Sequence, residues 1–369
     1  MAITQETILE IDLSKLKHNF EFIKSKIKPK TKFLAVVKAF AYGSDAETIA
    51  QYLQQLDVDY FAVAYVHEGV KLRKAGIHKP ILVLHPQTTN FKLLIEHCLE
   101  PSLYNFRVLI EFISIVTTLK HHNYPIHIKF NTGLNRLGFS QDDIEKITEH
   151  TNSSVAVNVT SIFSHLAASE DLNEKEFTQS QINLFDEIKT KFEYLSTDMP
   201  FSHLTNTSGI LNFPEAHYDM VRAGIGLYGF GNSESHSKHL QPIAALKSII
   251  SQIHIIEKGE SLGYNRGFIA NKTVRTATIP IGHADGISRQ YGNGKGYVFI
   301  NSQKAFILGN VCMDMIMVDV TNIKCKEADE IIIFNEKHKA SSIAQAVNTI
   351  SYEIITSISH RIKRIFINE

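Results

Sequence analysis

A single lysine, Lys38, ends the short apolar run LAVV, and Tyr42 and Gly43 follow it closely. Taken alone, such a lysine is most simply a strand-end charge in solvent, because lysine is rarely buried. In a pocket, however, desolvation lowers the pKa of an amine, and the neutral amine can form a Schiff base with an aldehyde. Lys38 is therefore a candidate to hold an aldehyde cofactor, and Tyr42 is placed to hydrogen-bond a phosphate on it.

Other polar residues also follow apolar runs. Lys129 and Arg136 flank NTG, His165 ends IFSH, Thr207 ends HLTNT, and Arg222 lies in VRAGIG. Each alone has a common structural explanation, namely a solvated charge, a core histidine or a helix N-cap. Together, cations, a histidine and glycine-bounded loops suit a planar anionic ligand. The GIG segment at 224–226 would let backbone N–H groups approach phosphate oxygens. If the ligand is pyridoxal phosphate, Lys38 is the residue that holds it.

The elements that must position these residues are short apolar strands alternating with helical segments. They are FLAVVK (33–38), YFAVAYV (60–66), PILVLH (80–85), LEPSLY (99–104), IHIKFN (126–131), SSVAVNVTSIFSHL (153–166), FSHLTNT (201–207) and MVRAGIGLYG (220–229). About eight such units favour a closed (β/α)8 barrel of the TIM type. An open doubly wound sheet explains this half of the chain nearly as well. In a barrel, the candidate residues fall at the C-terminal ends of strands, where such active sites are built.

The pattern changes near residue 240 to alternating β-branched residues with glycine-rich turns such as GNGKG (292–296). This pattern predicts a separate, mostly antiparallel β domain. We therefore expect an α/β protein with an N-terminal (β/α)8 barrel over 1–240 and a C-terminal β domain over 241–369. Residues 1–13 are expected to be able to pair with the β domain.

Composition excludes several function classes. The 38 basic residues balance the 38 acidic ones, so no overall field favours nucleic acid or an anionic membrane. Three scattered cysteines, Cys98, Cys312 and Cys325, make neither a disulfide framework nor a tetrahedral zinc site. No signal-peptide pattern and no apolar span near about 20 residues is found. We expect a cytoplasmic globular protein with no metal, nucleic-acid or membrane partner.

The chain resembles the alanine racemase family of fold-type III pyridoxal-phosphate enzymes along its whole length. The motifs that carry the resemblance are AVVKAFAYG (35–43), KFNTGLNRLGF (129–139), FSHLAASED (163–171), VRAGIGLYG (221–229), GYNRGF (263–268), IPIGHADG (279–286) and NVCMDMIMVDVT (310–321). The family's barrel and C-terminal β domain agree with the organisation expected above. The chain is most similar to the branch whose members can be fused to a Mur-type ligase.

The resemblance implies interconversion of L-alanine and D-alanine, with D-alanine used for peptidoglycan. Lys38 is implied to carry the cofactor and to be the base for D-alanine. Tyr264 of the partner subunit is implied to be the base for L-alanine, so the family pattern implies a homodimer with shared sites. A tyrosine with a pKa of about 10 needs positive neighbours to act as a base, and His165 and Arg222 are the candidates.

The resemblance also implies binding roles. Cofactor-binding positions are Lys38, Tyr42, His165, Thr207, Arg222, Gly224, Ile225 and Tyr352. Arg222 matches the arginine that donates to the pyridine nitrogen. Arg136 and Met313, the latter from the partner, match substrate-binding residues, and Lys129 matches a lysine that is carbamylated in some relatives. The gate of the substrate channel corresponds to Asp171, His283 and Arg289.

Two departures from the family pattern bear on function. Thr207 stands where serine is common and keeps the hydroxyl group, whereas His283 replaces a tyrosine that narrows the gate. A wider gate leaves a broader amino-acid racemase, acting on serine as well, as one alternative. A non-catalytic pyridoxal-phosphate carrier is another, but a carrier needs no second base such as Tyr264. A decarboxylase of basic amino acids has a similar plan but would need a C-terminal cysteine signature that is absent.

Overall fold

In the computed structural model, which describes residues 6–231 and 233–368, eight parallel strands close into a barrel. The strands are β2 (Lys32–Val36), β3 (Tyr60–Val63), β4 (Ile81–Val83), β5 (Glu100–Leu103), β6 (Tyr124–Lys129), β7 (Val157–Phe163), β8 (Phe201–His203) and β9 (Met220–Ala223). They follow one another in chain order, and β9 pairs with β2 to complete the ring. The expected (β/α)8 barrel is therefore confirmed, and the open sheet is excluded.

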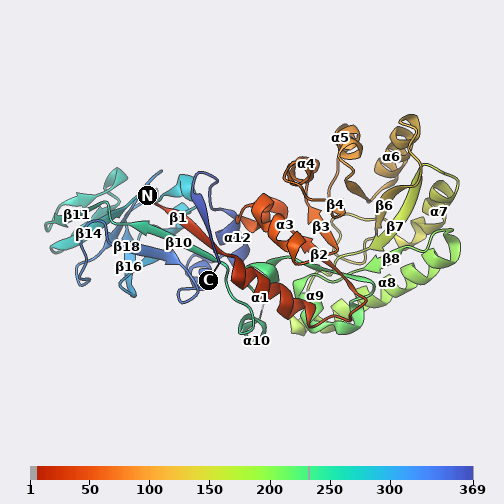
Figure 1. The fold of residues 1–369 in the computed structure, drawn as a ribbon. Helices are drawn as coiled ribbons and strands as arrows, with labels where there is room; N and C mark the ends of the chain where they lie inside the picture. The colour runs from red at the N-terminus through yellow and green to blue at the C-terminus, as the bar shows by residue number, and fades with distance from the viewer. Residues whose placement is uncertain (1–5, 232, 369) are drawn as a thin grey trace. The chain divides into compact units, whose positions relative to one another are not determined.

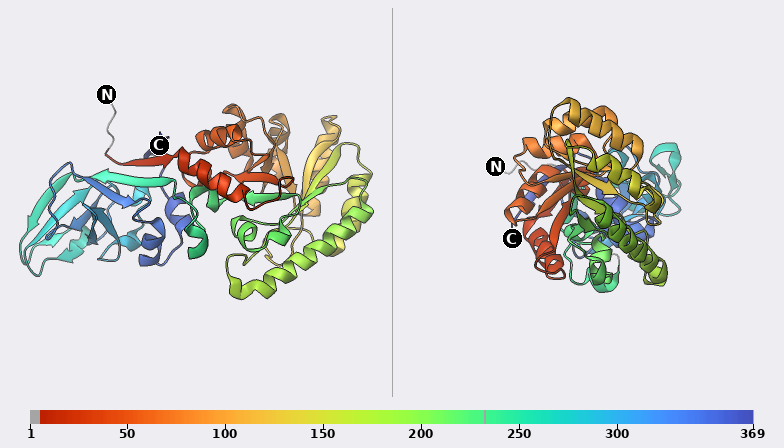
Figure 2. Two further views of the ribbon diagram at one scale, coloured as in Figure 1. Left: turned by 60° about the horizontal axis from the view of Figure 1, so that its bottom comes forward. Right: turned by 90° about the vertical axis from the view of Figure 1, so that its right-hand side faces the viewer.

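Helices surround the barrel strands on the outside (Figure 1 and Figure 2). They include α1 (Leu13–Lys24), α3 (Ala46–Gln55), α4 (Val66–Lys74), α5 (Phe91–Glu96), α6 (Phe106–Thr118), α7 (Ile144–Asn152), α8 (Lys175–Leu195) and α9 (Thr207–Asn212). A short helix, α10 (Glu234–Ser237), follows the last barrel strand in the chain. Short 3-10 turns are η1 (Thr88–Asn90), η2 (Gln141–Asp143), η3 (Leu172–Glu174), η4 (Pro214–Ala216) and η5 (Ile225–Tyr228). Because helices cover the outer face and side chains fill the interior, strands such as β3 are buried along their length. This is why they read as continuous apolar runs.

The β domain forms a nine-stranded sheet within the described residues, in the order β11-β14-β17-β16-β15-β18-β10-β1-β19. Its strands are β1 (Ile8–Asp12), β10 (Ala244–Ile249), β11 (Gln252–Ile256), β14 (Val274–Ile279), β15 (Tyr297–Ile300), β16 (Gln303–Leu308), β17 (Ile316–Asp319), β18 (Glu330–Phe334) and β19 (Lys363–Ile367). All neighbouring pairs are antiparallel except β1 with β19. The expected mostly antiparallel β domain is confirmed.

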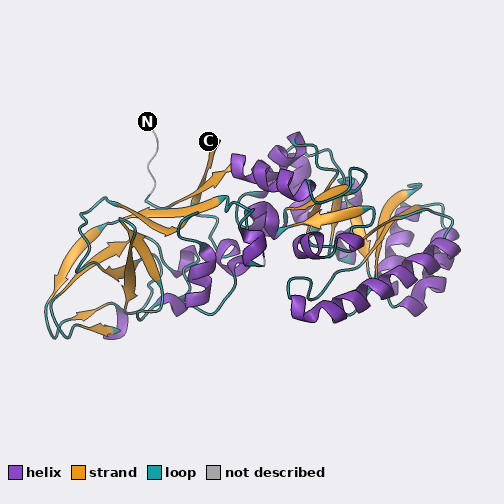
Figure 3. Ribbon diagram, turned by 90° about the horizontal axis from the view of Figure 1, so that it is seen from below, coloured by secondary structure: helices purple, strands orange, loops and turns teal. Residues whose placement is uncertain are grey.

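Smaller elements complete this domain, in which strands predominate and helices are short (Figure 3). They are the paired strands β12 (Ser261–Leu262) and β13 (Phe268–Ile269), the turns η6 (Tyr264–Arg266), η7 (His283–Asp285) and η8 (Arg289–Tyr291), and the helices α11 (Ala340–Ala346) and α12 (Ser351–Thr356). The loops between the strands thus carry several of the predicted site residues.

Two compact units divide the chain. Within the described residues, the first comprises 17–41, 46–231 and 233–240, and the second comprises 6–16, 42–45 and 241–368. We propose that these units are the two domains. Strand β1 pairs with β10 and β19 of the second unit, while residues 1–5 of the N-terminal segment lie outside the described residues. In the described part of the chain, no helix has the length and apolar character needed to cross a membrane.

Candidate active site

The backbone turns sharply at Lys38, two residues after strand β2 ends at Val36. Residues 39–42 all have positive φ angles, between 50° and 57°, and Gly43 follows at 88°. Together with Lys38 they form α2 (Lys38–Tyr42), whose backbone makes a left-handed helical turn. L-residues in this conformation cost roughly 1–2 kcal/mol each. Contacts from outside the turn must therefore hold it in place.

Glu68, near the start of α4, provides such contacts. Its Oε1 accepts the N–H of Ala39 at 2.7 Å. Its Oε2 accepts the N–H groups of Ala64 at 2.7 Å and Tyr65 at 3.0 Å. One carboxylate thus joins the residue after Lys38 to the N-terminal end of a barrel helix, where a negative charge is also favourable.

Four cations influence one another at this end of the barrel. Burial lowers the pKa of Lys38, Arg136 lowers it further, and Glu68 opposes both effects. Burial also lowers the pKa of Lys129 to about 8, with Arg136, Arg222 and Lys38 acting in the same direction. Concentrated positive charge of this kind favours an anionic ligand and increases the share of neutral amine on both lysines.

Arg222 is buried and held by a set of fixed acceptors. Its Nη2 donates to the carbonyl oxygens of Ser164 at 2.7 Å and Leu204 at 2.8 Å. Its Nη1 donates to Nδ1 of His203 at 2.6 Å, and Nδ1 of His165 lies 3.1 Å from Nη2. Burial lowers the pKa of Arg222 to about 9, so it is a cation at neutral pH. Burial and Arg222 hold the pKa of His165 well below its usual value, so His165 is neutral.

Thr207 organises a glycine loop after strand β9. Its hydroxyl oxygen accepts the N–H groups of Gly224 at 3.1 Å and Gly226 at 3.2 Å. A Cβ added to Gly226 would stand 2.6 Å from Cγ2 of Thr207, so a side chain has no room there. Asn206, not Thr207, is the N-cap of α9, because its side chain accepts the N–H of Gly209. The closely approached backbone suits a phosphate-binding loop.

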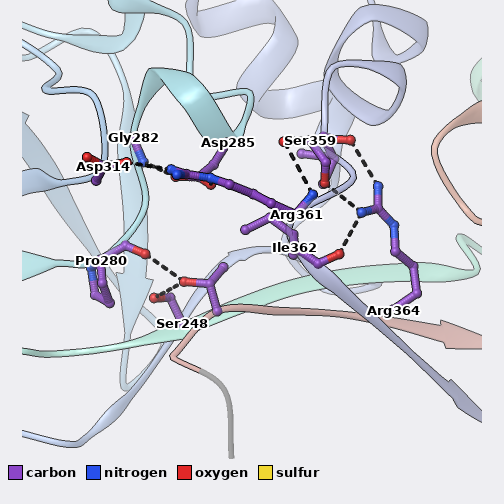
Figure 4. Close-up of polar contacts among 11 residues, drawn as sticks. Ser248, Pro280, Gly282, Asp285, Asp314, Ser359, Arg361, Ile362 and Arg364 are labelled. Carbon is purple, nitrogen blue, oxygen red and sulfur yellow. Dashed lines mark hydrogen bonds and ion pairs between the residues drawn. The ribbon is translucent and has the colours of Figure 1, made fainter.

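Tyr42 and Tyr352 lie together in the second unit. Their ring centroids are 6.1 Å apart, and burial raises the pKa of Tyr42. Nε and Nη2 of Arg364 donate to the carbonyl oxygen of Gly43 at 3.0 Å and 2.9 Å. The same guanidinium binds other carbonyl oxygens, including those of Ser359 and Ile362 (Figure 4). The end of the left-handed turn is thereby fixed to the C-terminal segment.

The predicted gate residue His283 opens η7 and is exposed. Two residues later, the carboxylate of Asp285 accepts Nε and Nη2 of Arg361 at 2.6 Å and 2.9 Å, and the N–H of Gly282 at 2.9 Å. Arg361 also donates to Asp314 at 2.7 Å (Figure 4). Arg361 therefore links the GHADG and CMDM segments, which are also joined by backbone hydrogen bonds.

Some predicted residues are exposed. Tyr264 and Met313 of the second unit are 72% and 59% exposed. Arg289 is also exposed, and Asp171 accepts the N–H of Asn173 in an exposed loop. Of the two residues expected to lower the pKa of Tyr264, only Arg222 carries a charge, since His165 is neutral.

The barrel gathers most of the predicted site residues at or just after strand ends. They are Lys38, Lys129, Arg136, His165, Thr207, Arg222, Gly224 and Ile225. Sequence reasoning missed His203, which contacts Arg222 directly, and Glu68, which accepts the N–H of Ala39 beside Lys38. Glu68 stands three residues after Tyr65, at a capping-box position, and His203 ends strand β8. The sequence could therefore have indicated both residues, by the capping-box spacing and by the position at a strand end.

These residues fit pyridoxal phosphate. Nε–H of the buried Arg222 has no acceptor among the described residues, so a ring nitrogen can be its partner. The Thr207 hydroxyl accepts two backbone N–H groups of the glycine loop, so its own proton can be donated to a phosphate. Lys38 provides an amine of lowered pKa for an aldehyde.

Comparison with known proteins gives one consistent result. Residues 11–231 match the family described as alanine racemase, N-terminal domain, and residues 243–366 match alanine racemase, C-terminal domain. A curated alanine racemase from Clostridium tetani is 34% identical over 374 residues, covering 98% of this chain and 95% of that protein.

Solved structures agree. The alanine racemase of Clostridium difficile 630 superposes with a TM-score of 0.93 at 32% identity, covering 100% of this chain and 97% of that one. The Bartonella henselae alanine racemase, with covalently bound pyridoxal phosphate, gives a TM-score of 0.89 at 27% identity, covering 99% of this chain and 100% of that one. Matches that span both domains establish that this chain belongs to the alanine racemase family of pyridoxal-phosphate-dependent enzymes.

Proposed function

We propose that this chain interconverts L-alanine and D-alanine with pyridoxal phosphate as its cofactor. The observation that carries the proposal is the group of Lys38, Lys129 and Arg222 at the ends of barrel strands, in a chain whose two domains match one racemase family. The lowered pKa of Lys38 supports its role as the amine that holds the cofactor.

The cofactor-binding residues follow from the same geometry. Lys38 would hold the aldehyde carbon, and Arg222 would donate to the ring nitrogen. The phosphate would be bound by Thr207, Gly224 and Ile225, with Tyr42 and Tyr352 added by the family pattern, and His165 would lie beside the cofactor. When bound, pyridoxal phosphate supplies an electron sink that makes the α-hydrogen of an amino acid acidic. Because arginine remains protonated, it would leave the ring nitrogen unprotonated. The cofactor would then withdraw electrons from the substrate less strongly.

Racemisation requires a base on each face of the substrate. We assign the α-proton of D-alanine to Lys38 and that of L-alanine to Tyr264 of the partner subunit, since each base returns a proton to its own face. The side chain of Tyr264 is highly exposed in a single chain, which is compatible with a role in the active site of the partner subunit. The positive charge of Arg222 would favour the phenolate form that Tyr264 needs.

Arg136 would hold the substrate carboxylate. Lys129 is proposed to react with carbon dioxide through its neutral amine, forming a carbamate and releasing a proton. A pKa of about 8 leaves about a tenth of the Lys129 amine neutral at pH 7. The resulting anion would pair with Arg136 and fix its position. A ¹³C NMR signal from labelled bicarbonate that disappears in Lys129→Met would support this, and its absence from the native chain would exclude the carbamate.

A homodimer is proposed because Tyr264 and Met313 would complete the neighbouring site. Mixing the variants Lys38→Ala and Tyr264→Phe tests this arrangement. Each mixed dimer would have one site with both native residues, so subunit exchange should restore about a quarter of native activity. Activity that stays at the level of the separate variants after verified exchange would exclude shared sites.

Substrate breadth and cellular role are further proposals. His283, Arg289 and Asp171 are proposed to form the channel gate, and exposed His283 favours a gate wide enough for serine. Rates with L-serine and L-alanine, compared between the native chain and His283→Tyr, test that point: a serine preference unchanged by the substitution would exclude His283 as its cause. We place the enzyme in the cytoplasm, supplying D-alanine for peptidoglycan. Cys98, Cys312 and Cys325 are free thiols, which is compatible with the reducing conditions of the cytoplasm.

The direct test is chiral analysis of alanine after incubation of the purified chain with pyridoxal phosphate and L-alanine. D-alanine should approach the amount of L-alanine, and Lys38→Ala should abolish its formation. Binding of pyridoxal phosphate without any D-alanine would instead favour the carrier alternative.

A further inference from the structure

A line of polar side chains runs through the interior of the barrel, and the mechanism above does not use it. It consists of Glu100, His127, Ser161 and His203, here called the Glu100 chain. Glu100 Oε2 lies 2.7 Å from His127 Nε2, and His127 Nδ1 lies 2.6 Å from Ser161 Oγ. Ser161 Oγ lies 3.0 Å from His203 Nε2, and His203 Nδ1 accepts from Arg222 at 2.6 Å. The line thus connects Glu100 with the cofactor-side cation.

The two ends of this line set the direction of the hydrogen bonds at Arg222 and at Glu100. Arg222 has only N–H donors, and an ionised Glu100 has only acceptors. His203 must therefore accept at Nδ1 and donate from Nε2 to the hydroxyl oxygen of Ser161. Ser161 has one proton and can give it to Nδ1 of His127, which donates from Nε2 to Glu100. His203 is then neutral and carries its proton on Nε2.

Burying these polar side chains costs free energy unless each of them has its hydrogen-bond partners. His127, Ser161 and His203 are all 0% exposed, in a barrel interior that is usually filled by branched apolar residues. Buried polar groups need partners, and a fully satisfied network fixes one geometry. Burial and the nearby Arg222 hold the pKa of His203 well below its usual value, in agreement with a neutral ring.

The position of Glu100 explains what the line connects. Glu100 begins strand β5, whereas the site residues stand at the opposite, C-terminal ends of the strands. Among the described residues, Arg222 has no carboxylate within ion-pair distance, so the Glu100 chain is its route to a negative charge. The charged or titratable groups around Glu100 besides His127 are Tyr60 of β3, which hydrogen-bonds its carboxylate, Tyr124 of β6 and Arg73 of α4.

We infer that Glu100, His127 and Ser161 are positioning residues that fix His203 in the Nε2–H tautomer and thereby fix Arg222 for the cofactor. In the opposite tautomer, an N–H of His203 would face an N–H of Arg222, and the guanidinium would have to move. The effect on the cofactor rests on the proposed function, whereas the tautomer of His203 does not.

Nitrogen-15 NMR of histidine-labelled full-length protein, with and without pyridoxal phosphate, tests the tautomer directly. A His203→Asn variant assigns the signals. In the native chain, Nε2 of His203 should be protonated and Nδ1 should not. Glu100→Leu removes the terminal acceptor, so both tautomers of His203 should appear although three hydrogen bonds separate the two residues. Glu100→Gln keeps an acceptor oxygen and should leave the native tautomer in place.

Ser161→Ala and Ser102→Ala form a second matched pair. Ser102 is also a buried barrel serine, paired in register with His127, but its hydroxyl has no hydrogen-bond partner. Ser161→Ala should mix the tautomers of His203 and weaken pyridoxal-phosphate affinity by roughly tenfold. Ser102→Ala should change neither, and Ser161→Thr should restore both.

Two results would overturn the inference. One is a native His203 that is protonated on Nδ1 or on both nitrogens. The other is an unchanged tautomer in both Glu100→Leu and Ser161→Ala. If either of these variants fails to fold, the other decides. Failure of the native chain to bind pyridoxal phosphate would refute the proposed function instead and leave the tautomer result standing.

Discussion

Replacing Glu68 by glutamine should weaken the turn that presents Lys38. The Glu68 carboxylate accepts N–H groups on both of its oxygens: Ala39 on Oε1, and Ala64 with Tyr65 on Oε2. Glutamine has a single acceptor oxygen, so its NH₂ group must face N–H donors on one side. The left-handed turn then loses a contact that holds it, or the start of α4 loses its cap.

The size of this effect can be worked out from the contacts. A hydrogen bond to a charged group contributes about 1.5–3 kcal/mol, and partial exposure of Glu68 reduces that figure. We therefore expect Glu68→Gln to lower the free energy of unfolding by about 1–2 kcal/mol. The turn cannot compensate, because each left-handed residue already costs roughly 1–2 kcal/mol. Loss of the negative charge should also lower the pKa of Lys38 further, because Glu68 raises it in the native chain.

Urea unfolding measures the stability change, and the pH dependence of amine labelling at Lys38, read by mass spectrometry, measures the pKa. Glu47→Gln is the matched control, because exposed Glu47 also stands in the first turn of a barrel helix. It should change neither quantity by a comparable amount. If Glu68→Gln matches Glu47→Gln in both assays, the carboxylate does not hold the turn, and our reasoning about Lys38 is wrong.

Three further predictions concern other parts of the structure. Thr207→Val orphans two buried glycine N–H groups and should lower the free energy of unfolding by about 1–3 kcal/mol in a urea titration, whereas Thr207→Ser should not. The pKa of Lys129 is about 8 in the folded chain against 10.5 for a free lysine, so the unfolded chain binds more protons between these values and stability should rise with pH across them. Lys129→Met should remove up to about 3 kcal/mol of that rise, and an unchanged slope would show that Lys129 is not desolvated. Asp285→Asn should speed hydrogen exchange at the Gly282 amide several-fold, because it loosens Arg361 and weakens the acceptor; unchanged exchange would show that this carboxylate does not hold the segment.

Much of the barrel could be predicted because its strands are buried on both faces. Runs such as YFAVAYV and PILVLH therefore stand out between helical segments, and their ends locate the residues at strand termini. Periodicity could not decide between a closed barrel and an open sheet. That choice depends on whether β9 pairs with β2, which are nearly 200 residues apart in the chain.

Other features carry no local signal. Residues 39–42 are Ala, Phe, Ala and Tyr, and none of these favours positive φ, so their left-handed turn depends on partners such as Glu68. The Glu100 chain depends on register between strands, because His127 and Ser161 meet only through the pairing of β6 with β7. A single chain also gives no structural signal that exposed Tyr264 acts in a partner's site, and that role came from family resemblance alone.

Proton exchange at Cα during turnover decides whether the two proposed bases work on opposite faces. The native chain with pyridoxal phosphate would be incubated with L-alanine in D₂O, and NMR would follow deuterium at Cα while the enantiomers are resolved. We predict deuterium at Cα together with accumulating D-alanine. Deuterium incorporation with full retention of the L configuration would contradict the two-base proposal, because it would mean that only one face of the substrate exchanges its proton.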